Sequence, residues 1–219
     1  MASTNASDTY FGSYARFQTA DKRSGALLAS SDNAVGDIGE IVWKLDERKR
    51  QQAWLENPYG QTIGCLDHAD SHKLALCHAK GWILRYVLSF TAYSEEPAPG
   101  VYWGQVAVFA YPPRYRDEFD TFVKAFARAA ADGSRPDPSM NAAGVARVLA
   151  DPSGWTPSNK VKIPKGDGRT VILKDHRSAH DKLLDKSRSG SIGCYIVSWA
   201  FLLALVAGVV WLLRSMGLF

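Results

Sequence analysis

The short motifs that identify common enzyme classes are missing from this chain. It has no Walker phosphate loop, no Gly-x-Ser-x-Gly nucleophile elbow, no Rossmann glycine fingerprint and no His-Glu-x-x-His zinc motif. These absences remove the usual sequence evidence for a nucleotide hydrolase, a serine hydrolase, a dinucleotide-dependent oxidoreductase or a zinc protease. We therefore expect a non-enzymatic protein with no catalytic residues and no cofactor.

Cysteine is scarce, with 3 residues among 219. Cys65 and Cys77 are too few for a disulfide framework, and Cys194 lies in an apolar run, so the composition favours a reducing compartment. Residues 1 to 37 also lack the apolar core of a secretory signal peptide. Both absences predict that the amino-terminal part is cytoplasmic.

A long uncharged run near the end of the chain, residues 189 to 213, is the strongest signal present. At about 1.5 Å per helical residue it is long enough for the ~30 Å hydrocarbon core of a bilayer. It therefore predicts a single-pass, tail-anchored membrane helix followed by a short end, residues 214 to 219. Aromatic residues mark its ends and small residues recur every four positions inside it, which predicts a homodimer formed through the helix. These residues are Tyr195, Trp199 and Trp211, and Ala200, Ala204 and Gly208.

Basic residues are concentrated just before that run, in a linker at residues 153 to 188. By the positive-inside rule, the amino terminus is then cytoplasmic and the carboxyl terminus lies on the opposite side of the membrane. We expect Lys182, Lys186 and Arg188 to contact anionic lipid headgroups. Because the net charge of +4 arises from this segment, nucleic-acid binding by bulk charge is disfavoured.

Residues 37 to 152 read as one cytoplasmic domain after a mobile tail at residues 1 to 36. The fold class that we predict is α+β, a small antiparallel sheet with two or three helices, in addition to the membrane helix. Period-two and apolar runs predict the strands, and 3.6-residue periodicity with capping residues predicts the helices. The expected strands are 38 to 45, 52 to 56, 62 to 66, 82 to 93, 101 to 111 and 170 to 174, and the expected helices are 70 to 80, 115 to 131 and a short one from 137.

The densest group of metal-ligating residue types consists of Cys65, His68, His72 and Cys77, with His78 beside it. His68 and His72 are four residues apart, as two ligands on one helical face are, so zinc is the candidate metal. The spacing matches no established zinc finger. The alternatives are that both cysteines are small core residues, or that one is a nucleophile in a thiol-dependent enzyme.

One stretch resembles a known family. Asn57-Pro58-Tyr59, then Ile63-Gly64-Cys65-Leu66, then a short helix with Leu74 and Ala75 and a strand from Trp82 are similar to the central part of a HIRAN domain, over about residues 52 to 92. HIRAN domains are small β-rich modules associated with recognising single-stranded DNA ends. The resemblance implies a fold relation and a nucleic-acid-binding alternative. The chain departs from the family at Gly60, where an acidic residue is usual, and it lacks a strand after the Asn-Pro-Tyr turn.

These observations together predict a tail-anchored membrane protein. Its cytoplasmic domain would bind an unidentified protein partner at the membrane surface. A metal- or thiol-dependent enzyme and a HIRAN-like nucleic-acid binder are the two alternatives.

Overall fold

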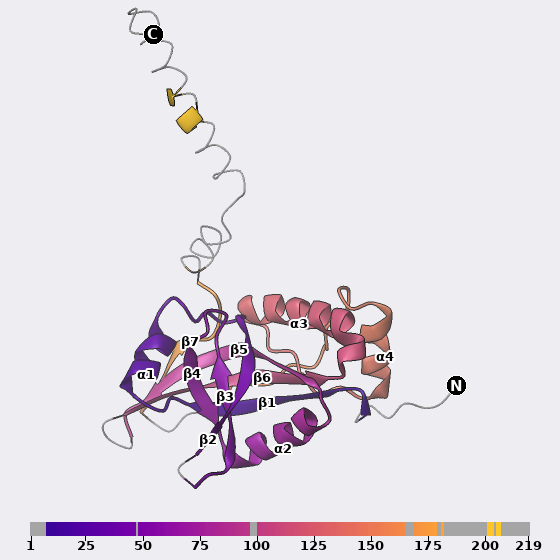
Figure 1. Ribbon diagram of the computed structural model, residues 1–219, viewed down its shortest axis with the longest axis horizontal. Coiled ribbons are helices and arrows are strands. Elements are labelled where there is room, and N and C mark those ends of the chain that lie inside the picture. Colours follow the sequence, from indigo (N-terminus) through magenta and orange to yellow (C-terminus); the bar gives the residue numbers. More distant parts are fainter. Residues whose placement is uncertain are drawn as a thin grey trace, which may run out of the picture. The chain divides into compact units, whose positions relative to one another are not determined.

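The computed structural model describes residues 8–46, 48–96, 100–164, 169–178, 181, 201–203 and 205–206. Residues 1–177 form one compact unit, and residues 178–219 form a second. The strands β1 to β7 and the helices α1 to α4 all belong to the first unit (Figure 1).

The sheet of the first unit is antiparallel and closes on itself. Its order is β2-β3-β4-β1-β6-β5-β7, and β2 also pairs with β5. Six strands therefore form a closed barrel, and β7 extends from β5 outside the ring. The strands are β1 (Phe11–Gln18), β2 (Ile38–Leu45), β3 (Gln51–Glu56), β4 (Thr62–Leu66), β5 (Ile83–Ser94), β6 (Val101–Tyr111) and β7 (Thr170–Lys174).

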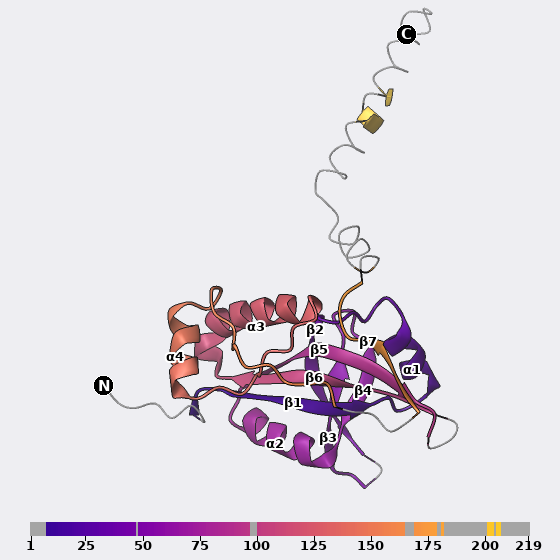
Figure 2. The same ribbon diagram turned by 180° about the vertical axis from the view of Figure 1, so that it is seen from behind.

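Side-chain caps fix where three of the helices begin. Asp21, Asp67 and Asn141 each accept a hydrogen bond from a backbone N–H three residues further on, which satisfies one of the unpaired donors of a helix start. The helices are α1 (Lys22–Ala29), α2 (His68–Ala79), α3 (Arg116–Ala131) and α4 (Ala142–Ala150), and the short 3-10 helix η2 (Pro113–Tyr115) precedes α3. Figures 1 and 2 show α2 and α3 on opposite sides of the barrel, with α4 beside one end of α3.

Two apolar clusters hold these layers together. The first fills the barrel and the space beneath α1 and α2, and it includes Phe17, Leu74 and Tyr86. The second lies between the outer face of β5 and β6 and the helices α3 and α4, with Phe109 and Phe122 fully buried. Successive side chains of β5 and β6 point to opposite faces, one toward each cluster, so both strands are apolar on both faces.

The predicted fold class, a small antiparallel sheet with two or three helices and a membrane helix, is wrong, because the sheet is a closed antiparallel barrel. The barrel includes β1, which lies within residues 1–36, where the sequence predicted a mobile tail. β1 lies between β4 and β6, two strands that are remote from it in sequence. Ala15 and Phe17 point into the barrel while Arg16 and Gln18 are exposed, so the segment is a strand with period two.

The prediction of a membrane-spanning helix is also wrong on this structure. Within the described ranges, no helix has the length and apolar character needed to cross a bilayer. The longest of them, α3, has 16 residues and carries charged side chains throughout, whereas a span needs about 20 mostly apolar residues. The predicted membrane localisation and topology, with a cytoplasmic amino terminus, are wrong for the same reason.

The residues named for that span and for its lipid contacts lie outside the described residues. They are Tyr195, Trp199, Ala200, Ala204, Gly208 and Trp211, together with Lys182, Lys186 and Arg188.

Two leucines of α2 test how this helix packs against the barrel. Leu74 is 1% exposed and Leu76 is 57% exposed. We expect Leu74→Ala to lower the free energy of unfolding by about 2–5 kcal/mol, because it removes buried methyl groups and leaves a cavity. Leu76→Ala, the matched control, should change it by less than ~0.5 kcal/mol. Denaturant unfolding measures both values, and similar losses in the two variants would contradict the packing of α2.

Candidate functional site

The predicted Cys and His cluster is spread over different environments. Cys65 is half-buried on the outer face of β4, and Cys77 is buried in the core near Trp82. His72 is exposed on α2, whereas the Nε2 atom of His68 lies 3.4 Å from a carboxylate oxygen of Asp46. Across the described part of the chain, no three or more His, Cys, Asp or Glu side chains converge in a way that could hold a metal ion.

A cavity lies elsewhere, beside the start of α4, and we call it the α4 pocket. Its volume is about 600 Å³. Three segments line it: the loop before α4, the first turns of α4, and the extended chain that follows. The lining residues are Asp137, Ser139, Met140, Asn141, Ala143, Gly144, Arg147, Trp155, Pro157, Ser158 and Asn159.

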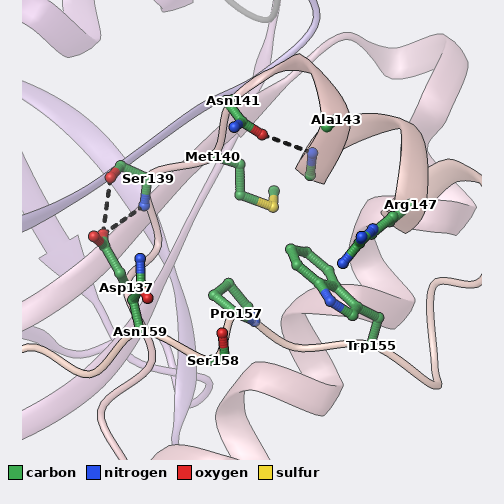
Figure 3. A pocket seen from close by; sticks show the side chains of 11 residues that line it. Asp137, Ser139, Met140, Asn141, Ala143, Arg147, Trp155, Pro157, Ser158 and Asn159 are labelled. Atoms are coloured by element: carbon green, nitrogen blue, oxygen red, sulfur yellow. Dashed lines mark hydrogen bonds between the residues drawn. The ribbon is translucent and has the colours of Figure 1, made fainter.

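Figure 3 shows the charged groups of the α4 pocket on opposite sides. Arg147 places its guanidinium carbon 6.0 Å from the ring centre of Trp155, where a cation and an aromatic face attract each other. On the other side, Asp137 accepts hydrogen bonds from the N–H and the hydroxyl of Ser139, each at 2.9 Å. The carboxylate is therefore engaged by its own loop, while Arg147 is exposed at the rim.

The loop that forms one wall of the pocket is attached to β1. Tyr10, just before β1, donates its hydroxyl hydrogen bond to the carbonyl of Pro138 at 2.7 Å. Tyr14 donates in the same way to the carbonyl of Pro136 at 2.9 Å. Any side chain at Gly12 would overlap the Pro138 carbonyl, so this close approach requires glycine. Burial raises the pKa of both tyrosines, so both hydroxyls remain protonated donors at neutral pH.

Arg135 fixes the same loop to the barrel from the other side. Although only 6% exposed, it donates to the hydroxyl of Ser89 at 2.6 Å and to the side-chain oxygen of Gln105 at 2.5 Å. The Nε–H of Arg135 donates a third hydrogen bond to the carbonyl of Val161 at 3.1 Å. The guanidinium carbon also lies over two rings, 4.7 Å from the centre of Tyr14 and 5.1 Å from that of Phe90. Burial lowers the pKa of Arg135, and its hydrogen bonds offset the cost of burying the charge.

The lining of the α4 pocket offers hydroxyl groups, an apolar wall and one exposed cation. Its hydroxyl groups, on Ser139 and Ser158, have no histidine or lysine beside them among the lining residues, and a serine nucleophile needs such a base. Its apolar wall, formed by Met140, Trp155 and Pro157, can take an apolar group of a ligand. Arg147 adds a cation beside that wall.

A second surface lies across the outer faces of β1 to β4, and we call it the barrel groove. It contains a cavity of about 230 Å³ that Arg16, Gln52 and Cys65 help to line, and another of about 390 Å³ at Lys44 and Trp54. The Nζ atom of Lys44 lies 4.8 Å from the ring centre of Trp54. The barrel groove is thus polar, partly aromatic and basic.

Sequence reasoning named Cys65 but missed the other residues of both surfaces. In the α4 pocket, the available signals were Asp137-Pro138-Ser139, interpreted as a helix start, and Trp155, an aromatic residue in a segment otherwise rich in proline and polar residues. Neither signal shows that the loop at Asp137 and the segment around Trp155 lie side by side in the fold. The chain matches no known protein family, no curated protein and no solved structure.

The two described cysteines test the thiol-enzyme alternative. Burial raises the pKa of the Cys65 thiol and of the Cys77 thiol. A raised pKa means a smaller thiolate fraction at a given pH, whereas a nucleophilic cysteine needs a lowered one. In a Cys194→Ser variant we expect both thiols to react with Ellman's reagent more slowly than free cysteine at a pH of about 8. The reaction should become fast after unfolding. A native thiol that reacts faster than free cysteine would restore the thiol-enzyme hypothesis.

Proposed function

We propose that the first unit is a non-enzymatic binding module and that the α4 pocket is its recognition site. The ligand is an extended peptide segment in which an acidic side chain stands next to an apolar one. The observation that carries the proposal is the position of Arg147, which is exposed at the rim with its guanidinium carbon 6.0 Å from the ring centre of Trp155. A carboxylate can bind the guanidinium in two-pronged geometry while the neighbouring apolar group contacts the aromatic wall.

The charge of the pocket supports an acidic rather than a basic ligand. Arg147 and Asp137 are its charged lining residues, and Asp137 already accepts two hydrogen bonds from Ser139. The first turn of α4 also faces the pocket through Ala143 and Gly144, and a helix start attracts negative charge. The pocket therefore offers an incoming carboxylate more attraction than repulsion.

Preorganisation supports the same proposal. The pocket wall is fastened to the barrel by the tyrosine hydroxyls of Tyr10 and Tyr14 and by the buried side chain of Arg135. A wall that is already ordered loses little conformational freedom when a ligand binds, so more of the contact energy appears as affinity.

Replacement of Arg147 tests this function. Seven-residue peptides selected from a display library on the full-length chain provide the probes, and isothermal titration calorimetry measures their affinity. We expect the selected peptides to contain an acidic residue beside an apolar one. Arg147→Gln should weaken them roughly ten- to hundredfold, because a hydrogen bond to a charged group contributes about 1.5–3 kcal/mol.

The matched control is Arg128→Gln, which removes an exposed arginine of α3 that does not line the pocket. It should leave the affinity unchanged. Equal affinity for the Arg147→Gln variant, or selected peptides without acidic residues, would contradict the proposed site.

The HIRAN resemblance leads to a second candidate function, single-stranded nucleic-acid binding in the barrel groove. The basic and aromatic side chains of that groove favour it, since nucleic acid is bound by cations along its backbone and aromatic faces against its bases. Arg16→Glu together with Lys44→Glu should then abolish retention of a fluorescent single-stranded oligonucleotide at physiological salt. An oligonucleotide that is not retained by the unaltered chain removes this candidate without affecting the α4 pocket.

A further inference from the structure

The end of the first unit, residues 174–177, binds the loop that leads into β2. We call these residues the strap, and we call residues 30–37 the β2 entry loop. Figures 1 and 2 both show β7 beside α1, the helix that precedes this loop. Lys174, the last residue of β7, donates hydrogen bonds from its ammonium group to three backbone carbonyls. They belong to Leu28 at 3.3 Å, Asn33 at 2.8 Å and Ser30. One cation thus joins the end of α1 to the first half of the loop, as lysines near helix ends commonly do.

Arg177 binds the second half of the β2 entry loop. Its Nε–H donates to the carbonyl of Val35 at 3.2 Å, and its Nη2 donates to the carboxylate of Asp37 at 2.5 Å. Its backbone N–H donates to the carbonyl of Ala131, the last residue of α3, at 2.8 Å. The Arg177 and Asp37 side chains are 15% and 23% exposed, so salt screens this ion pair less than one on the open surface.

The β2 entry loop is itself bonded to β5. The N–H of Gly36 donates to the carbonyl of Leu88 at 2.8 Å, and the N–H of Leu88 donates to the carbonyl of Asp37 at 2.9 Å. The residues that follow the loop, 38–40, form the three pairs with β5 that close the barrel. The strap therefore holds the segment whose position decides whether β2 reaches β5.

The ion pair across the closing strands is weaker than the contacts of the strap. Arg85 of β5 contacts Glu40 of β2 at 2.5 Å, but the Glu40 side chain is 64% exposed. Ion pairs with an exposed partner contribute little to stability. Hydrogen bonds from a charged donor are roughly twice as strong as neutral ones, and the strap makes several of them to backbone carbonyls.

We propose that the strap is a conformational device that couples the chain beyond residue 177 to closure of the barrel. Withdrawal of the strap breaks the hydrogen bonds of Lys174 and Arg177, frees the β2 entry loop and opens the pairing of β2 with β5. Coupling between two events is reciprocal, so opening of that pairing also weakens the binding of the strap. The second unit begins at residue 178, directly after the strap. Tension on that part of the chain reaches the strap before the rest of the first unit.

Native-state hydrogen exchange of the unaltered full-length chain tests this coupling. The amides of Gly36, Leu88 and Arg177 report on the loop, on the closing strands and on the strap. If one opening releases all three, their protection factors converge as denaturant is added. We expect the common value to be at least roughly tenfold below that of Val106, which lies between β1 and β5, because partial opening costs less than global unfolding.

Two variants test which contacts carry the coupling. At the denaturant concentration where the three amides converge, Arg177→Gln and Lys174→Met should each make Gly36 and Leu88 exchange roughly ten- to hundredfold faster, because each removes hydrogen bonds from a charged donor. Arg177→Lys keeps the charge and should recover part of the loss. The matched control is Arg169→Gln, which removes a basic residue whose side chain is 67% exposed, and it should leave both amides unchanged.

Two results would overturn the proposal. In the unaltered chain, Leu88 could exchange only as slowly as Val106 while the Arg177 amide opens without it, which would show that the strap detaches from a closed barrel. Alternatively, folded Arg177→Gln and Lys174→Met variants could leave the exchange of Gly36 and Leu88 unchanged. The first measurement needs no variant, so it decides the question even where a substitution prevents folding. Both results leave the α4 pocket and its proposed ligand untouched.

Discussion

One edge of strand β5 pairs with two different strands, β2 and β7, and the rest of the structure depends on this double pairing. Residues 85–87 pair with β2, which closes the barrel, and residues 91–94 pair with β7. Three residue pairs between β2 and β5 close the barrel, and in the middle pair Gly39 faces Tyr86. A side chain at Gly39 would overlap the ring of Tyr86 and the carbonyl of Glu56, so the two strands can meet only where β2 carries glycine.

The part of β5 between its β2-paired and its β7-paired residues also supports the α4 pocket. The register of β5 shifts between Leu88 and Phe90, so that Leu88 points into the barrel and Phe90 packs outside with Trp103. Ser89, at the shift, accepts the hydrogen bond from Arg135. The loop held by Arg135 lines the pocket, so the shape of the α4 pocket depends on the bulge in β5 and on the strand that closes the barrel.

Local patterns predicted most single elements but not how they assemble. The bounds of β2, β4, β6 and β7 are confirmed, and the turn at Asn57 is confirmed by its side-chain hydrogen bonds to two backbone amides. These features depend on residues that are close in sequence. The strand β1, the β2–β5 closure and the outward position of Phe90 depend on remote partners. The α4 pocket was missed for the same reason, because Asp137 and Trp155 meet only after folding. The long uncharged run was interpreted as a membrane helix from composition alone, and no described helix supports that interpretation.

Closure of the barrel is the central claim, and nuclear Overhauser contacts between β2 and β5 test it most directly. Ile38 and Val87 face each other across the closing pair. Their neighbours Asp37 and Leu88 are joined by a backbone hydrogen bond of 2.9 Å, so Ile38 and Val87 form the adjacent, closely spaced pair. We expect a strong contact between the Hα atoms of Ile38 and Val87, together with slow hydrogen exchange of the Leu88 amide. An absent contact with fast exchange at Leu88 would show an open sheet and would contradict the closed barrel.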